Sequence, residues 1–181
     1  MAVRRKSGLI ALCGVTVALE VVCLLLSSVP IASLSLAVFA GILSFPIVIE
    51  AGRRAGIGVY VAAALLSLLL VPEMEGKAVF IAFFGYYPVF KAWLEQKRLP
   101  RPAEWALKLA LFNLSVVAAY ALLLTVFHLD PDSFSIGGVS LPWVFLLAGN
   151  GIFLLYDLCL TNLVSRYLAS WQSRVRRLFH F

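Results

Sequence analysis

The chain has 181 residues, of which 62% are hydrophobic and only 13% are charged. A soluble domain is about half apolar and about a quarter charged, so this chain has too little polar surface to cover a water-facing exterior. Its net charge of +6 would suggest nucleic-acid binding in a soluble protein, but here the basic residues lie in short stretches between apolar runs, where they set membrane orientation. We therefore expect an all-α, polytopic membrane helix bundle that is surrounded by a lipid bilayer and binds no nucleic acid.

Six apolar segments come close to the roughly 20 residues that a membrane-spanning helix needs. In chain order they are residues 8–28, 31–49, 56–71, 77–94, 105–127 and 141–168. The last would be about 42 Å long as a helix, against about 30 Å for the hydrocarbon core, so we expect it to tilt or to project beyond the bilayer. The basic tail, residues 169–181, has apolar residues at roughly helical spacing, which predicts a helix on the membrane surface. The whole chain is expected to form a single transmembrane domain.

Positive charge is distributed asymmetrically between the ends of these six segments. The chain has 15 Lys and Arg residues, and in a six-span arrangement all of them except Lys77 fall on one side. Lys77 falls on the other side, beside the acids Glu73, Glu75, Asp130 and Asp132. Because basic loops stay in the cytoplasm, both termini are expected to be cytoplasmic.

The first segment has an alternative interpretation as a cleaved signal peptide, with Arg4, Arg5 and Lys6 as its basic n-region. Three features favour its retention as a span. Glu20 lies inside the apolar run, no clear small-x-small cleavage site follows, and the run exceeds the usual length of about 7–15 residues.

The stretch FFGYYPVFKAWLEQKR, residues 83–98, places a glycine, two tyrosines, a proline and a lysine inside the fourth apolar segment. Pro88 removes a backbone hydrogen bond and bends the helix, while Gly85 lets another backbone approach the bend. Two interpretations remain open. The bend is either a packing kink, at which Tyr86 and Tyr87 donate hydrogen bonds to neighbouring helices, or a hinge or cavity wall, because interrupted helices often line binding sites in membranes.

Two acidic residues lie deep in the apolar segments, where a charge is costly and usually faces the bundle interior with a partner. Glu20 lies about 12 Å inside the outer boundary, and Asp157 lies about 13 Å from the cytoplasmic one. Their depths predict an inner and an outer group of polar side chains. The inner group comprises Asp157, Thr161, Asn113, Tyr87 and Lys91, and the outer group, a candidate solute site, comprises Glu20, Tyr120 and Asn150. Each group is either a structural network between helices or a functional site.

The first segment also carries a stripe of small residues, Ala11, Gly14 and Ala18. Gly14 and Ala18 have the small-xxx-small spacing that permits close helix approach. The stripe serves either internal packing or docking against another membrane protein.

Motifs of the common catalytic and metal sites are absent from the sequence. It contains no H-E-x-x-H helix, no P-loop and no G-x-S-x-G elbow, and His128 and His180 are isolated. Cys13, Cys23 and Cys159 are neither paired nor spaced as metal ligands. We therefore expect no enzymatic activity, no cofactor and no metal, and ATP hydrolysis would require other chains.

Three strings cover most of the last three segments: FFGYYPVFKAWLEQKR, EWALKLALFN and LLYDLCLTNLVSRYL. They resemble a family of small bacterial integral membrane proteins that brings no known activity. As a whole, the chain resembles the substrate-binding S-component of energy-coupling factor (ECF) vitamin transporters, which are six-helix proteins of about this size with cytoplasmic termini. The resemblance implies a bacterial inner-membrane protein whose residues Ala11, Gly14 and Ala18 dock on a transmembrane coupling subunit. It further implies an outer solute site formed by Glu20, Tyr120, Asn150 and the loop 130–138.

Two functional hypotheses follow from these features. The first is uptake of a small solute by a binding subunit that works with a separate ATPase module. The alternative is a non-transporting membrane scaffold or cell-envelope assembly partner. A solute-binding subunit should enclose an outward-facing polar cavity, whereas a scaffold should be packed solid.

The predicted orientation can be tested with single cysteines in a background in which the native cysteines are replaced by alanine. Arg54→Cys and Arg98→Cys are expected to react with a membrane-impermeant maleimide from the same, cytoplasmic face, because both loops are basic. The control Glu75→Cys should react only from the opposite face. Labelling of the first two variants from opposite faces would contradict the six-span arrangement.

Overall fold

The computed structural model describes the backbone of residues 2–27, 32–126, 135–136, 139–140 and 142–179, and the side chains of residues 7–27, 32–119, 121 and 146–179. Within these residues the chain forms helices joined by short connections, and one short antiparallel pair, β1 (Ser135–Ile136) and β2 (Val139–Ser140). The expectation of an all-α chain is therefore confirmed.

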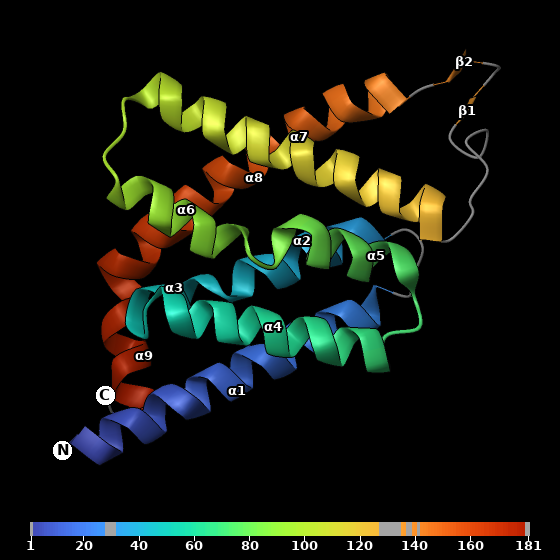
Figure 1. Ribbon diagram of the computed structural model, residues 1–181. Coiled ribbons are helices and arrows are strands. Elements are labelled where there is room, and N and C mark those ends of the chain that lie inside the picture. The colour runs from blue at the N-terminus through green and yellow to red at the C-terminus, as the bar shows by residue number, and fades with distance from the viewer. Residues whose placement is uncertain (1, 28–31, 127–134, 137–138, 141, 180–181) are drawn as a thin grey trace.

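The helices run back and forth between two ends of the molecule (Figure 1). They are α1 (Ala2–Leu26), α2 (Ser33–Leu43), α3 (Phe45–Glu50), α4 (Arg53–Leu70), α5 (Met74–Val79), the π-helical η1 (Phe80–Phe84), α6 (Tyr87–Gln96), α7 (Arg101–Val126), α8 (Pro142–Arg166), the π-helical η3 (Tyr167–Trp171) and α9 (Gln172–Leu178). In Figure 1 the start of α1, the α3–α4 junction, the α6–α7 turn and α9 lie toward the left, and the α4–α5 connection lies on the right. The exposed arginines Arg53, Arg54 and Arg98 thus share one end of the molecule, and Glu75 lies at the other.

The connection between α4 and α5 shows how local sequence sets the helix ends. Val71 precedes Pro72 and is extended, as a residue before proline usually is, so α4 ends at this point. The carboxylate of Glu73 then accepts hydrogen bonds from the backbone N–H groups of Glu75 and Gly76, at 2.6 and 2.7 Å, and caps α5.

Helix α1 packs against α2 and α4 through a single face. Its buried residues recur at helical spacing: Leu12, Thr16, Glu20, Val21, Leu24 and Ser27. The small residues Ala11, Gly14 and Ala18 lie on exposed positions of the same helix. This stripe is therefore not used for packing inside the described part of the chain.

The second predicted segment, 31–49, forms two helices, α2 and α3, which meet at the cap residue Ser44. Pro46 lies in the first turn of α3, where its missing N–H is tolerated. The Ser44 hydroxyl donates to the backbone carbonyl of Gly41 at 3.0 Å. The two helices still count together as one apolar stretch long enough to cross a membrane, Ser33–Glu50.

The fourth predicted segment, 77–94, is interrupted rather than simply bent. The backbone N–H of Gly85 donates to the carbonyl of Phe80 at 2.8 Å, five residues back, which forms the π-helical turn η1. Pro88 lacks an N–H and lies in the first turn of α6, so the helical hydrogen bonds start again at Tyr86. The chain is thus broken between η1 and α6, and α5 and α6 both run toward the same end of the molecule (Figure 1).

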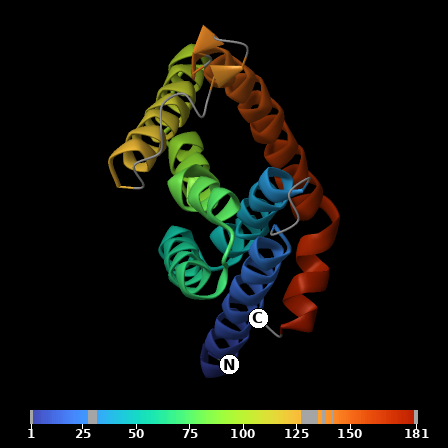
Figure 2. The ribbon, with the colours of Figure 1, turned by 90° about the vertical axis from the view of Figure 1, so that its right-hand side faces the viewer.

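Aromatic side chains fill the space where η1, α6, α7 and α8 meet. The buried ring of Phe83 has its centroid 5.1 Å from that of Phe112 and 5.5 Å from that of Phe153, both edge-to-face, while Phe112 and Phe153 are stacked at 4.9 Å. Tyr87 and Tyr156 extend this cluster toward the polar groups described below. Figure 2 shows the segment from α5 to α6 lying between α7 and the helices α1 and α4.

The basic tail continues from α8 through η3 as helix α9 and packs against the bundle. Val175 and Phe179 pack near Ile47 and Val59, and Arg176 Nε donates to a carboxylate oxygen of Glu50 at 2.8 Å. Its exposed side carries Trp171, Arg174, Arg177 and Leu178. The predicted location of this side on a membrane surface stays a prediction.

Within the described residues, four helical stretches are long and apolar enough to cross a membrane: Ser7–Leu26, Ser33–Glu50, Arg53–Leu70 and Leu146–Leu178. Large apolar side chains on them face outward, with Leu69 81% and Leu155 69% exposed, which suits contact with lipid. The predicted span 77–94 is not among the four, since it is broken at Gly85 and Tyr86. The predicted span 105–127 lies partly outside the residues whose side chains the structure describes, and it stays a prediction.

One close helix crossing can be tested with alanine. A Cβ atom at Gly41 would overlap the backbone carbonyl of Phe84, so Gly41→Ala should lower the free energy of unfolding by about 1–3 kcal/mol. The control Gly58→Ala meets nothing within 4 Å and should raise it by up to about 1 kcal/mol through helix propensity. Thermal unfolding in detergent micelles measures both, and an equal response of the two variants would contradict the crossing.

Candidate functional site

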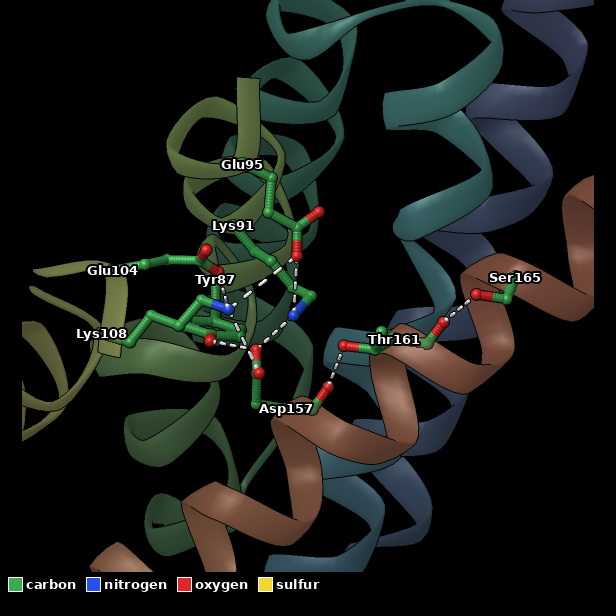
Figure 3. Close-up of polar contacts among 8 residues, drawn as sticks. All are labelled: Tyr87, Lys91, Glu95, Glu104, Lys108, Asp157, Thr161 and Ser165. Atoms are coloured by element: carbon green, nitrogen blue, oxygen red, sulfur yellow. Dashed lines mark hydrogen bonds and ion pairs between the residues drawn. The ribbon is translucent and has the colours of Figure 1, made fainter. Parts of the chain in front are cut away.

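The buried carboxylate of Asp157, on α8, is the centre of the largest polar cluster among the described residues (Figure 3). Three side chains donate to it. Tyr87 OH donates to Oδ1 at 2.6 Å, Lys91 Nζ donates to the same oxygen, and Lys108 Nζ donates to Oδ2 at 3.2 Å. Because Tyr87 and Lys91 belong to α6 and Lys108 to α7, one carboxylate connects three helices.

Local sequence explains why two donors come from α6. Tyr87 and Lys91 are four residues apart, so they lie on the same helix face one turn from each other. The break before Tyr87 turns this face toward α8, and Figure 3 shows both side chains pointing at Asp157.

Each of the two lysines also forms an ion pair with a second carboxylate. Lys91 Nζ lies 3.0 Å from Glu95 Oε1, and Lys108 Nζ lies 2.6 Å from Glu104 Oε1; both are pairs four residues apart on one helix. Lys108 Nζ also lies 3.9 Å from the same Glu95 oxygen. We name these six residues the Asp157 cluster: Tyr87, Lys91, Glu95, Glu104, Lys108 and Asp157.

Burial decreases outward through the Asp157 cluster. The side chains of Lys91, Lys108 and Asp157 are 5%, 3% and 3% exposed, whereas those of Glu95 and Glu104 are 45% and 24% exposed. The core of the cluster therefore holds two cations and one anion, and the second anionic partner of each lysine lies nearer the surface. Every charge in the cluster has an opposite charge within ion-pair distance.

The cluster is suited to holding helices together, because its hydrogen-bonding groups are engaged with one another. Among the described residues no group of three or more His, Cys, Asp or Glu side chains is arranged to hold a metal ion. Replacing Asp157 would leave the buried Lys91 and Lys108 with only their more exposed partners, Glu95 and Glu104. Breaking a buried ion pair is far more costly than removing a surface pair.

Thr161, which we predicted in the inner group, lies beside this cluster without joining it. Its hydroxyl donates to the backbone carbonyl of Asp157 at 2.8 Å, and Ser165 donates in the same way to the carbonyl of Thr161 at 2.9 Å (Figure 3). Both residues are exposed, so they interact with their own helix and not with the carboxylate.

The remaining inner residue, Asn113, is paired with a residue that we predicted in the outer group. Asn113 Nδ2 donates to Asn150 Oδ1 at 3.1 Å, and Asn150 Nδ2 donates to Asn113 Oδ1 at 2.9 Å. The two amides form a reciprocal link between α7 and α8, so the predicted division into two groups does not hold for them. On the neighbouring surface of α7, Ser115 shares a hydrogen bond of 2.7 Å with Tyr86.

Glu20 differs from every other buried acid in the described residues. It is fully buried on α1, and neither of its carboxylate oxygens has a hydrogen-bond partner in the part of the chain that the structure describes. Two buried hydroxyls share this property, those of Tyr156 and Ser33. The side chain of Tyr120, the third residue of the predicted outer group, lies outside the described residues.

Sequence reasoning missed three members of the Asp157 cluster and the hydroxyl of Tyr156. Lys108 was interpreted only as an orientation signal, although Glu104 four residues earlier is a spacing that often marks an ion pair. Glu95 has the same relation to Lys91. Nothing in the sequence around Tyr156 indicates that its hydroxyl would be buried without a partner, and the adjacent Asp157 is the more conspicuous polar residue of that helix turn.

Comparison of the chain with protein-family models, with curated proteins and with solved structures gives no match.

The role of Asp157 in holding three helices can be tested by replacing its charge. Asp157→Asn leaves Lys91 and Lys108 buried without their shared anion, so the free energy of unfolding should fall by about 3–5 kcal/mol. Thr161→Val, one turn away on the exposed side, should change it by less than about 0.5 kcal/mol. Thermal unfolding in detergent compares the two, and a loss below about 1 kcal/mol for Asp157→Asn would exclude a central role for this carboxylate.

Proposed function

We propose that this protein is a six-span membrane subunit that binds a small solute from outside and works with a separate ATPase module, in the manner of an S-component. The observation that carries the proposal is the fully buried carboxylate of Glu20, which has no hydrogen-bond partner among the described residues. Buried polar groups in proteins are nearly always paired, and an ionisable group inside a membrane normally has a partner and a function.

The contrast between Glu20 and Asp157 supports this reading. At Asp157 the chain supplies its own cations, which indicates a structural network. At Glu20 the residues that the structure describes supply none, which suits a group whose partner is a bound molecule. In a bilayer the paired cluster would lie toward the cytoplasmic ends of the helices, and it would close that side while a solute is held farther out.

Partner subunits enter the proposal for two reasons. The sequence lacks a P-loop, so energy from ATP must come from other chains. The exposed small residues Ala11, Gly14 and Ala18 offer a smooth helix face on which a coupling subunit could pack closely. Orientation with both termini in the cytoplasm, in a bacterial inner membrane, belongs to the same proposal.

A membrane scaffold remains the second candidate, and one observation favours it. The aromatic rings around Phe83 pack closely against one another, and the charged groups of the neighbouring Asp157 cluster pair with one another. Both features are expected for a rigid body whose function resides on exposed helix faces. In that case Glu20 would have no molecule to bind.

Native mass spectrometry of the detergent-purified protein distinguishes the two functions. We expect a bound small molecule in the wild-type protein, its loss in Glu20→Ala, and its retention in Glu75→Ala, which removes an exposed acid. A small molecule that is equally present in both variants would place the site away from Glu20. Absence of any small molecule, together with stoichiometric co-purification of an envelope protein, would support the scaffold.

A further inference from the structure

We propose that the exposed side of the C-terminal helix binds the phosphate headgroup of an anionic phospholipid. We name this surface the tail face, and it consists of four exposed side chains at the end of η3 and on α9: Trp171, Arg174, Arg177 and Leu178. The inference goes beyond the proposed solute binding and does not depend on it. It starts from the way in which the tail is attached to the bundle.

One side of the tail is attached to the bundle through a carboxylate at the end of α3. Arg176 Nε donates to Glu50 Oε2 at 2.8 Å, and Tyr167 OH donates to Glu50 Oε1 at 3.3 Å. The side chain of Glu50 is only 1% exposed. Val175 and Phe179 pack against the apolar cluster that α1, α3 and α4 form. These contacts fix which side of α9 faces the protein and which side remains exposed.

The residues of the tail face follow one another along a single stripe of the helix. Trp171, Arg174 and Leu178 are spaced by three and four residues, and Arg177 lies three residues after Arg174, so their side chains are neighbours on the helix surface. Trp171 is 62% exposed and Leu178 is 74% exposed. The stripe thus combines two cationic groups with two large apolar side chains.

The attachment of α9 also sets its height along the bundle. Glu50, to which α9 is bound, is the last residue of the apolar stretch Ser33–Glu50, and the next apolar stretch, Arg53–Leu70, begins three residues later. In a bilayer the ends of such stretches lie near the lipid headgroups, where Trp side chains are enriched and basic residues remain outside the hydrocarbon. The tail face would therefore lie at the depth of the lipid phosphates.

The charges around the tail face favour an anion. Neither Arg174 nor Arg177 forms an ion pair with an acid in the part of the chain that the structure describes. The acid at the attachment point, Glu50, is already paired with Arg176. The first two residues of α4, which follow closely in sequence, are exposed arginines as well. A negatively charged partner would supply what these guanidinium groups lack.

A phospholipid matches both parts of the tail face. Guanidinium groups bind phosphate oxygens in a bidentate manner, and basic residues on an amphipathic helix are attracted to anionic lipid. The apolar side chains of Trp171 and Leu178 would contact the region where headgroups meet acyl chains. A free phosphate ion has no apolar part for these two side chains, and an acidic protein segment would have to reach them at the level of the headgroups. The geometry therefore favours a lipid over both.

Native mass spectrometry of the detergent-purified full chain tests this proposal. Phosphatidylglycerol, which is anionic, and phosphatidylcholine, which is neutral overall, are added in equal amounts with identical acyl chains. We expect the wild-type protein to bind phosphatidylglycerol at least about fivefold more than phosphatidylcholine, which is the preference that a single arginine near a charged membrane surface would give. Equal binding of the two lipids would overturn the proposal.

Variants assign the preference to the tail face. The double variant Arg174→Gln, Arg177→Gln should reduce it to about twofold or less. The control Arg98→Gln, Arg101→Gln removes the same charge from exposed positions at the α6–α7 turn and should retain at least about two thirds of the wild-type preference, because exposed charges act over a short range. Full retention of the preference in the first variant, or equal losses in the two, would overturn the proposal.

Further measurements distinguish the lipid from other anions. Trp171→Ala should lower the binding of phosphatidylglycerol at least about twofold, since the apolar contact is lost. Displacement of the lipid by an equal concentration of sodium phosphate would indicate a free-anion site and overturn the proposal. Binding of a hexaglutamate peptide by a protein without lipid preference would assign the tail face to a protein partner and overturn it as well. Thermal unfolding verifies that each variant is folded, and if the Arg174, Arg177 variant is not, unchanged lipid binding in Trp171→Ala overturns the proposal instead.

Discussion

The shared carboxylate of Asp157 is the constraint on which the arrangement of α6, α7 and α8 depends. An aspartate in the interior of an apolar bundle requires compensation, and here two lysines from two other helices supply it. Because the oxygens of one carboxylate accept all three donors within hydrogen-bond distance, the depths of α6, α7 and α8 relative to one another are fixed at this point. Hydrophobic packing has no comparable directional preference, so it could not set this register alone.

The interruption of the chain at Gly85 and Tyr86 makes that geometry possible. The π-helical turn η1 ends there and α6 begins at Tyr87, which points the face with Tyr87 and Lys91 toward α8. Tyr87 then has two roles, since its ring packs 4.9 Å from that of Phe83 while its hydroxyl reaches Asp157. Aromatic packing and ion pairing are thus joined through one side chain, and irregular helix turns of this kind often occur at functional sites.

Pairing of polar groups is unequal across the molecule, and this inequality is the basis of the functional proposals. Asp157, Asn113 and Asn150 all have partners within the chain. Glu20 on α1 and the hydroxyl of Tyr156 on α8 have none among the described residues. A protein that needed only rigidity would gain nothing from leaving a buried carboxylate unpaired, whereas the proposed binding of a solute through this group requires it to be free.

The sequence by itself determined the helical class, the apolar exterior and the presence of deep polar residues, because these follow from composition and from hydrophobic runs that any helix must bury or expose to lipid. It also indicated an interruption beside Pro88, because proline lacks the backbone N–H that would donate a hydrogen bond within the helix. Tertiary structure decided which polar residues meet. Asn113 and Asn150 were predicted at different depths, yet they pair directly, because the angle at which α7 crosses α8 is set by packing and not by position along either helix. Lys108 joins Asp157 for the same reason. The isolation of Glu20 also depends on the fold, since whether a carboxylate finds a partner depends on what the neighbouring helices place opposite it.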